Sequence, residues 1–142
     1  MPGARRVFVD SNVLLYFVDA SDPTRQARAS EWLHHLWASG AGAISWQVLH
    51  EFYVNAVRKL AVPPAEARFL VDSLVEWRPV DSSATLIHRA WHWADDAQVS
   101  YWDSLILAAA ELADCRVLLS EDFQAGRRFG EIQVVNPFTT AP

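Results

Sequence analysis

The chain alternates short apolar runs with longer stretches in which apolar residues recur at helical spacing. Val7–Val9 is a β-branched and aromatic run typical of a buried strand, and the helix-starting residues Asp10–Asn12 follow it directly. The apolar run Val13–Phe17 then predicts a short helix. The first strand would deliver Asp10 to the edge of a sheet, where the sites of open α/β sheets gather. The pattern suits a simple helix cap at Asp10 equally well.

Longer stretches have the apolar periodicity and the terminal residues of helices. The clearest follows Ser45, where apolar residues form one stripe and polar residues the opposite face. The stretch after Ser100 is apolar on every face from Leu105 to Ala110, which is typical of a helix buried on most sides. The expected helices run from Pro23 to Ser39–Gly42, from Ser45 to about Leu60, from Pro63–Pro64 through Val75, from Asp81 or Ser82 to Asp95–Asp96, and from Ser100 to about Ala113.

Strands are predicted between these helices. Cys115–Leu119 is apolar without alternation, as in a covered parallel sheet, and Ile132–Val135 is the last strand after a polar loop, Gln124–Gly130. The other strand candidates are Ala43–Ile44 and Arg78–Val80. Because strands and helices alternate without a repeat or linker, residues 1–142 are expected to form one α/β domain with a mostly parallel sheet and helices on both faces.

The composition narrows the classes of function. The 142 residues carry a net charge of −5, which argues against a protein that holds nucleic acid by bulk electrostatics alone. A nuclease stays possible, because a metal-loaded acidic site carries its own positive charge. Only Val7–Val9 separate Arg6 from Asp10, too few residues for a signal-peptide core, and no apolar run approaches a membrane span. We therefore expect a soluble, cytoplasmic protein whose single cysteine, Cys115, is a buried thiol.

Acidic residues stand at the starts of elements that a parallel sheet would bring together. Asp10 ends the first strand, and Asp122 follows the strand Val117–Leu119. Asp103 lies in the first turn of the most apolar helix, and Glu51 lies in the second turn of the helix after Ser45. Unpaired carboxylates at close range repel and raise each other's pKa, which a divalent cation would relieve. Ligands that are all oxygen favour Mg²⁺ or Mn²⁺ over zinc.

Each acid also has a structural explanation. Ser100 and Asp103 have the spacing of a capping box, so Asp103 could serve only to start its helix. Glu51 lies opposite the apolar stripe of its helix, a position typical of a solvated face, and Asp122 could be a loop acid or a helix cap. A zinc site is weakly indicated: His88 and His92 share a helix face, but the sequence offers no third ligand.

Four motifs occur in order along nearly the whole chain. They are Val9–Tyr16, Gln47–Tyr53, Tyr101–Leu107 and Leu118–Gln124, with Asn136–Phe138 near the end. With these motifs the sequence resembles the PIN domain, and specifically the VapC-like toxins of toxin–antitoxin pairs. The resemblance implies a three-layer α/β/α sandwich with a short, mostly parallel central sheet, and the activity of a metal-dependent ribonuclease.

The resemblance extends to individual residues. The positions that match the family's acidic quartet are Asp10, Glu51, Asp103 and Asp122. Those that match its supporting polar positions are Ser11, Asn12 and Ser120, with Glu121 as an extra acid beside the last aspartate. A serine at position 11, where threonine is common, keeps the hydroxyl group.

The implied reaction is hydrolysis of an RNA phosphodiester. Asp10, Asp103 and Asp122 would hold one or two Mg²⁺ or Mn²⁺ ions, with Glu51 bound directly or through water and able to position the attacking water. Ser11, Asn12, Ser120 and Glu121 would orient these ligands. Cations that could contact flanking phosphates are Arg58, Arg127 and Arg128.

The resemblance also implies two protein partners. These are a second copy of the chain, forming a homodimer, and a cognate antitoxin that lays an apolar segment in a groove. The tryptophans that could form these surfaces are Trp32, Trp37, Trp91 and Trp93. Trp91 and Trp93 are two residues apart and cannot share one helix face, so at least one is expected outside the core.

Two other functions fit the acids less well. A phosphotransferase with Asp10 as its nucleophile needs a second aspartate two residues later, where this chain has Asn12. A receiver-type phosphoacceptor needs a lysine near the last strand, and the only lysine is Lys59. A non-catalytic metal-binding interaction module remains the alternative, although keeping all four acids argues against it.

Overall fold

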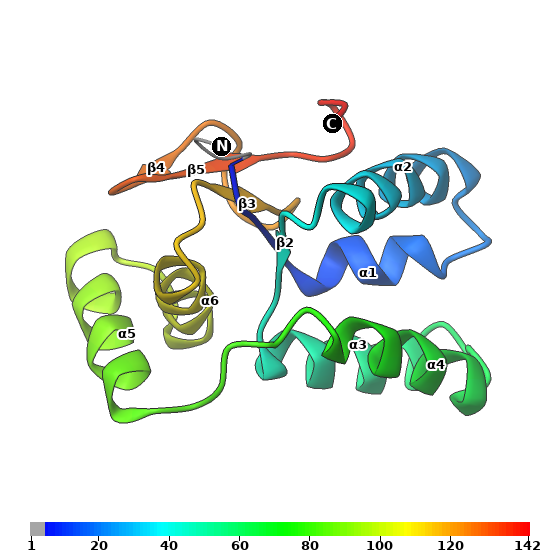
Figure 1. Cartoon of the computed structure of the whole chain (residues 1–142), viewed down its shortest axis with the longest axis horizontal. Coiled ribbons are helices and arrows are strands. Elements are labelled where there is room, and N and C mark those ends of the chain that lie inside the picture. Colours follow the sequence, from blue (N-terminus) through cyan, green and yellow to red (C-terminus); the bar gives the residue numbers. More distant parts are fainter. Residues whose placement is uncertain (1–4) are drawn as a thin grey trace.

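The computed structural model describes residues 5–142 and contains a short, mostly parallel sheet (Figure 1). The strands are β1 (Val7–Val9), β2 (Gly42–Ala43), β3 (Val117–Leu119), β4 (Arg128–Phe129) and β5 (Ile132–Val135). They lie in the order β2-β1-β3-β5-β4, and only β4 runs antiparallel to its neighbour. Val9 pairs with Leu119, and Leu119 pairs with Val135, so three parallel strands end at the same level.

The helices form two groups. They are α1 (Ser11–Phe17), α2 (Pro23–Ser39), α3 (Trp46–Arg58), α4 (Pro64–Val75), α5 (Ala84–Ala97) and α6 (Tyr101–Leu112). The first helix packs against α2 and α3, α3 packs against α4, and α5 packs against α6. Figure 1 shows these two groups on opposite sides of the central strands. The α/β class and the mostly parallel sheet predicted from the sequence are therefore confirmed.

The apolar patterns determine which helices the core contains. The central strand β1 is buried along its whole length, and so is the run Ile106–Ala110 of α6. Serine caps start three of the helices: the backbone N–H groups of Val48, Leu86 and Asp103 donate to the hydroxyl groups of Ser45, Ser83 and Ser100. Cys115 is buried as expected, and burial raises the pKa of its thiol to about 12.

Three local predictions need correction. The cap of α5 is Ser83, so neither Asp81 nor Ser82 starts that helix. Arg78–Val80 is not a strand, because Val80 forms a single parallel bridge with Ser45. The polar loop Gln124–Gly130 contains the two-residue strand β4, which is too short to show any alternation.

The tryptophans divide between the core and the surface. Trp32 and Trp93 are buried, so the prediction that they form partner surfaces is wrong for both. Trp37 and Trp91 have 42% and 54% of their surface exposed. The expected division between Trp91 and Trp93 is therefore confirmed. Trp102, which the sequence analysis passed over, is more exposed than any of these four at 65%.

The C-terminal segment after β5 packs back over α1 and α2. The indole N–H of Trp32 donates to the carbonyl oxygen of Thr140 at 2.8 Å. The ring of Phe138 meets the ring of Tyr16 edge to face at a centroid distance of 4.9 Å. The guanidinium of Arg25 lies over both rings, 5.3 Å from Tyr16 and 5.6 Å from Phe138. The C-terminal segment therefore packs an aromatic ring against the guanidinium of Arg25 and helps to hold it in place.

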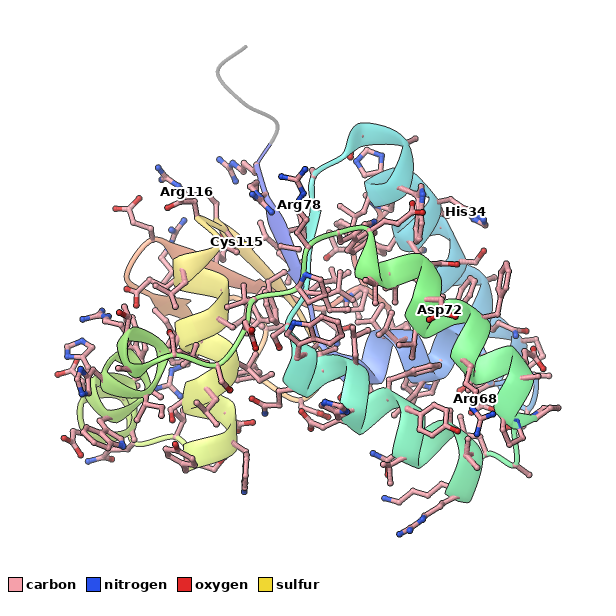
Figure 2. All side chains as sticks on the ribbon, turned by 60° about the horizontal axis from the view of Figure 1, so that its bottom comes forward. His34, Arg68, Asp72, Arg78, Cys115 and Arg116 are labelled. Atoms are coloured by element: carbon pink, nitrogen blue, oxygen red, sulfur yellow. The ribbon has the colours of Figure 1, made fainter. Side chains whose placement is uncertain are left out.

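The two ends of the strands differ in charge. Figure 2 shows Arg78 and Arg116 at the edge of the molecule where the strands begin. Asp10 and Asp122 follow β1 and β3 at the opposite, carboxyl edge. Within residues 5–142, no helix combines the length and apolar character needed to cross a membrane.

Candidate metal centre

The parallel register places two polar segments side by side at the carboxyl edge of the sheet. The backbone N–H of Asp10 donates to the carbonyl oxygen of Leu119 at 3.1 Å, and that of Ser120 donates to Val135 at 3.1 Å. The ladder therefore continues one residue past each strand. Asp10 and Ser120 are consequently fixed by the backbone of the most buried part of the sheet.

Hydrogen bonds join these segments into one network, which is buried at Asp10, Asn12 and Ser120 and exposed at Asp122. The hydroxyl of Ser120 donates to Oδ2 of Asp10 at 2.7 Å, and the backbone N–H of Ser11 donates to Oδ1 of Asp10 at 2.8 Å. The amide nitrogen of Asn12 lies 3.1 Å from the Ser120 hydroxyl and 3.2 Å from Oδ2 of Asp122. It also lies 3.3 Å from Oδ2 of Asp10. Asn12 therefore links the first aspartate to the last.

Asp10 is a carboxyl group with a strongly displaced pKa. Burial raises the pKa to about 7, and the charges of Asp122 and Glu51 add to this effect. The hydrogen bonds from Ser120 and Ser11 lower it, but by less than burial raises it. Ionised Asp10 is thus poorly stabilised by its protein surroundings alone.

The other two acids come from helices and face the same region. Glu51 of α3 is half-buried, and burial is the main reason that its pKa is raised. Gln47 lowers the pKa of Glu51, while the charges of Asp103 and Asp122 raise it. Burial also raises the pKa of Asp103, against the effect of Ser100 and with the charge of Asp122. All four carboxylates therefore interact electrostatically across α3, α6 and the ends of two strands.

Glu51 does not occupy a solvated helix face. Its Oε1 atom is buried and has no hydrogen-bond partner. The side chain lines a cavity of about 400 Å³ that also borders Asn12 and Asp122. The interpretation of Glu51 as a solvated residue was wrong, because the periodicity of α3 alone does not show that α6 and the strand ends stand opposite it. The capping role of Asp103 is present alongside its place in the acid cluster.

The donor set fits a hard divalent cation, although the carboxylates do not form a finished cage. Within residues 5–142, no group of three His, Cys, Asp or Glu side chains is arranged to hold a metal ion. Electrostatic coupling acts over a longer range than coordination, which needs oxygen atoms about 2.1 Å from Mg²⁺. The orphaned Oε1 of Glu51 and the displaced pKa of Asp10 are both features that a bound cation would relieve.

Glu121 is oriented differently from the four acids. Its Oε2 atom accepts from Nε of Arg25 at 3.1 Å, so its carboxylate forms an ion pair at the rim of the site. Its backbone N–H donates to Oδ1 of Asn12 at 3.1 Å, so its main chain still supports the network. Arg25 was missed by the sequence analysis because it lies 96 residues away along the chain.

The predicted RNA-contacting arginines lie outside the network just described. Arg127 donates to the carbonyl oxygen of Ala97 at 2.9 Å and lies over the ring of Phe129. Arg128 and Arg58 are exposed. Among the described residues that line the 400 Å³ cavity, the cation is Lys59, which sequence reasoning had set aside. Lys59 is the C-cap of α3, and no local pattern in the sequence indicates that it faces the acids.

Solved structures of low sequence identity share this fold. The VapC20 toxin of Mycobacterium tuberculosis, which cleaves the sarcin–ricin loop, aligns with a TM-score of 0.61 at 21% identity, over 82% of this chain and 89% of its own. A toxin–antitoxin complex from Klebsiella pneumoniae aligns with a TM-score of 0.64 at 18% identity, over 92% and 97%. VapBC2 of Rickettsia felis, bound to a promoter DNA fragment, aligns with a TM-score of 0.65 at 16% identity, over 90% and 96%.

Sequence comparison identifies the family. No curated protein matches the chain significantly. The family model described as the PIN domain matches residues 7–129, which include all four acids and both strand ends that carry the network. The order of the motifs, the sheet and the matched region agree. The chain therefore belongs to the PIN-domain family.

Proposed function

We propose that this chain is a divalent-metal-dependent ribonuclease that hydrolyses RNA phosphodiester bonds as the toxin of a toxin–antitoxin pair. The observation that carries the proposal is the acid cluster. Four coupled carboxylates meet at the carboxyl edge of the sheet, and one of their oxygen atoms, Oε1 of Glu51, is buried without a partner. A cluster of this kind suits a hard cation and the phosphate group that the cation would attract.

In the proposed mechanism the acids divide the work. Asp10, Asp103 and Asp122 would hold Mg²⁺ or Mn²⁺, with Glu51 bound directly or through water, and the ion would supply positive charge at the phosphate. Glu51 accepts a proton from the attacking water, a role that suits a carboxylate whose pKa burial has raised. The water oxygen bonds to phosphorus, the bond from phosphorus to the leaving ribose oxygen breaks, and that oxygen takes a proton from solvent. Ser11, Ser120 and Asn12 hold Asp10 and Asp122 in their orientations.

Positive groups around the cluster would position the RNA strand. Lys59 lines the acid-bordered cavity and is the best placed to hold a phosphate next to the one that is cut. Arg58 precedes it at the exposed end of α3. Arg127 and Arg128 lie in the β4 region and would contact more distant phosphates. The negative net charge makes these few cations more important than they would be on a basic protein.

The proposal is tested by cleavage of a single-stranded RNA with Mg²⁺ or Mn²⁺. Asp10→Asn should lower the cleavage rate by roughly a hundredfold or more, because it removes a metal-binding charge from the centre of the network. Asp72→Asn is the matched control, since Asp72 is an exposed acid on α4 (Figure 2), a helix that carries none of the four acids. Cleavage that continues in chelator, or an active Asp10→Asn variant, would refute the mechanism.

The proposed protein partners are a cognate antitoxin and a second copy of this chain. The structural neighbours include toxin–antitoxin complexes. An apolar groove of about 340 Å³ lies between α2 and α4, bordered by Trp37, Leu70 and Phe69. Phe69 has 76% of its surface exposed, a large apolar exposure for a lone chain. We place the apolar segment of the antitoxin in this groove.

Phe69→Asp should weaken antitoxin binding at least tenfold, because it places a charge in the apolar groove. Calorimetric titration of the chain with its cognate antitoxin measures the change in affinity. RNA cleavage by the free variant should stay at the level of the original chain, since the groove is distinct from the acid cluster. Unchanged affinity would exclude the groove as the antitoxin site. The homodimer is tested separately, by light scattering of the free chain.

A further inference from the structure

A second, larger cavity adjoins the acid cluster. It has a volume of about 1060 Å³ and lies between α3 and α6, with the start of α5 on its far side. The residues that matter here are Trp46, Gln47, His50, Glu51, Trp102 and Leu105. Its volume is at the upper end of the range for pockets that hold small molecules.

This cavity is joined to the acids through Glu51 and Trp102. Glu51 lines both this cavity and the 400 Å³ cavity, so the two spaces share one wall. Trp102 directly precedes Asp103 in the first turn of α6. The side-chain amide of Gln47 donates to the carbonyl oxygen of Trp102 at 3.3 Å and so ties α3 to α6 at the cavity. A group held here is therefore next to a phosphate placed at the acids.

The lining selects against a phosphate and in favour of a flat neutral group. Glu51 and Asp81 would repel an anion, and among the described lining residues there is neither lysine nor arginine. The wall is mostly apolar, and 65% of the surface of Trp102 is exposed. Gln47 and His50 of α3 add hydrogen-bonding side chains to the same cavity. An aromatic face with polar groups at its edge is the arrangement that binds an unstacked nucleobase.

We propose that this cavity binds one base of a single-stranded RNA, adjacent to the phosphate that is cut. Trp102 stacks on the base, and Gln47 and His50 hydrogen-bond to its edge. The position of the cut relative to this base rests on the ribonuclease proposed above, whereas binding of the base itself does not. Trp102 would accordingly supply affinity for any stacked base, and Gln47 and His50 would set which nucleotide is preferred beside the cleavage position.

The test is a binding measurement in the Asp10→Asn background, in which the RNA should stay intact. The probes are an eight-nucleotide oligoadenylate carrying 2-aminopurine and an abasic strand with the same sugar–phosphate backbone. Trp102→Ala should weaken binding of the oligoadenylate by about five- to a hundredfold, the loss typical of one stacked base, and remove quenching of 2-aminopurine. Binding of the abasic strand should not change. Trp102→Phe should restore most of the affinity.

Trp91→Ala is the matched control, because Trp91 is also exposed but stands on α5, with its ring against His88. It should leave both affinities unchanged. The proposal is overturned if the oligoadenylate does not bind, if Trp102→Ala binds it normally, or if both strands weaken equally. It is also overturned if Trp102→Ala changes only the oligomeric state. Base-dependent binding by a chain that cuts no RNA would refute the ribonuclease and leave the base site standing.

Discussion

At the scale of single residues, the protein keeps a carboxyl group where burial opposes its charge. Asp10 is only 5% exposed, and its two oxygen atoms accept from Ser11, Ser120 and Asn12. Neutral donors of this kind hold the group in position without neutralising it. Asp10 is therefore oriented by the fold, while its charge is opposed by burial.

Asp10 should make the metal-free protein less stable as the pH rises. Its pKa is about 7 in the folded chain against an ordinary 3.8, so the folded state binds more protons across that interval. Stability is full below the lower value and is lost as the pH rises through the upper one. The loss is on the order of 4 kcal/mol, since each pH unit corresponds to about 1.4 kcal/mol.

Urea unfolding in chelator at pH 5 and pH 8 measures this effect. Asp10→Asn should flatten the dependence and be the more stable variant at pH 8, because it has no charge to bury. Comparing the two chains cancels the titration of other groups, including Glu51 and Asp103, whose raised pKa values act in the same direction. Parallel pH curves for the two proteins would show that Asp10 is not the group responsible.

At the scale of elements, the sequence predicts what is local and misses what depends on packing. The caps Ser45 and Ser100 follow from pattern alone, whereas the cap of α5, Ser83, is the last of three consecutive residues that could each cap a helix. The parallel bridge between Val80 and Ser45 lies just before these three residues and ties the segment to the start of α3. No local rule reports that bridge.

The same distinction between local pattern and tertiary packing explains which site residues the sequence predicts. The positions of Asp10 and Asp122 follow from two apolar strands and the rule for parallel sheets. The prediction that Glu51 is a site residue depended on family resemblance, because the periodicity of α3 puts Glu51 on the face opposite the apolar stripe. The ion pair of Glu121 with Arg25 and the cavity beside Trp102 join elements distant in sequence. Tertiary packing creates both.

Two variants in and beside α6 separate capping of the helix from the proposed metal-binding role of Asp103. Ser100→Ala should destabilise the chain by about 1 kcal/mol, because the N–H of Asp103 loses its acceptor. Asp103→Asn in chelator should be as stable as the original chain or more so, since it removes a repelled charge. Thermal unfolding measures the stability of both variants, and Ser83→Ala, which removes the cap of α5, is the control for loss of a cap. A clear loss of stability in Asp103→Asn would favour a purely structural role.

At the scale of the whole molecule, the acid cluster lies where the two helical groups meet the sheet. Glu51 comes from α3 in one group, Asp103 comes from α6 in the other, and Asp10 and Asp122 come from the strand ends between them. An ion bound by all of them would add direct links between α3, α6 and the strand ends. Metal binding should therefore stabilise the entire fold.

Mg²⁺ should raise the melting temperature at pH 8. At a concentration of about a hundred times its Kd, the gain is about 2.7 kcal/mol, or roughly 5–10 °C for a chain of this size. The shift should be smaller at pH 5, where Asp10 is largely protonated, and should nearly vanish in Asp122→Asn. Scanning calorimetry measures the melting temperature, and the reference is the same protein in NaCl of equal ionic strength. An equal shift in Asp122→Asn would place the ion elsewhere.

The packing of the C-terminal segment has a practical consequence for handling the protein. Thr140 is fastened to Trp32, and Phe138 lies beneath Arg25, which in turn holds Glu121 at the rim of the site. Cutting the chain back to Val135 would remove Phe138, and with it one aromatic contact of Arg25, while keeping every strand that the structure describes. A tag fused at the N-terminus would leave these contacts unchanged.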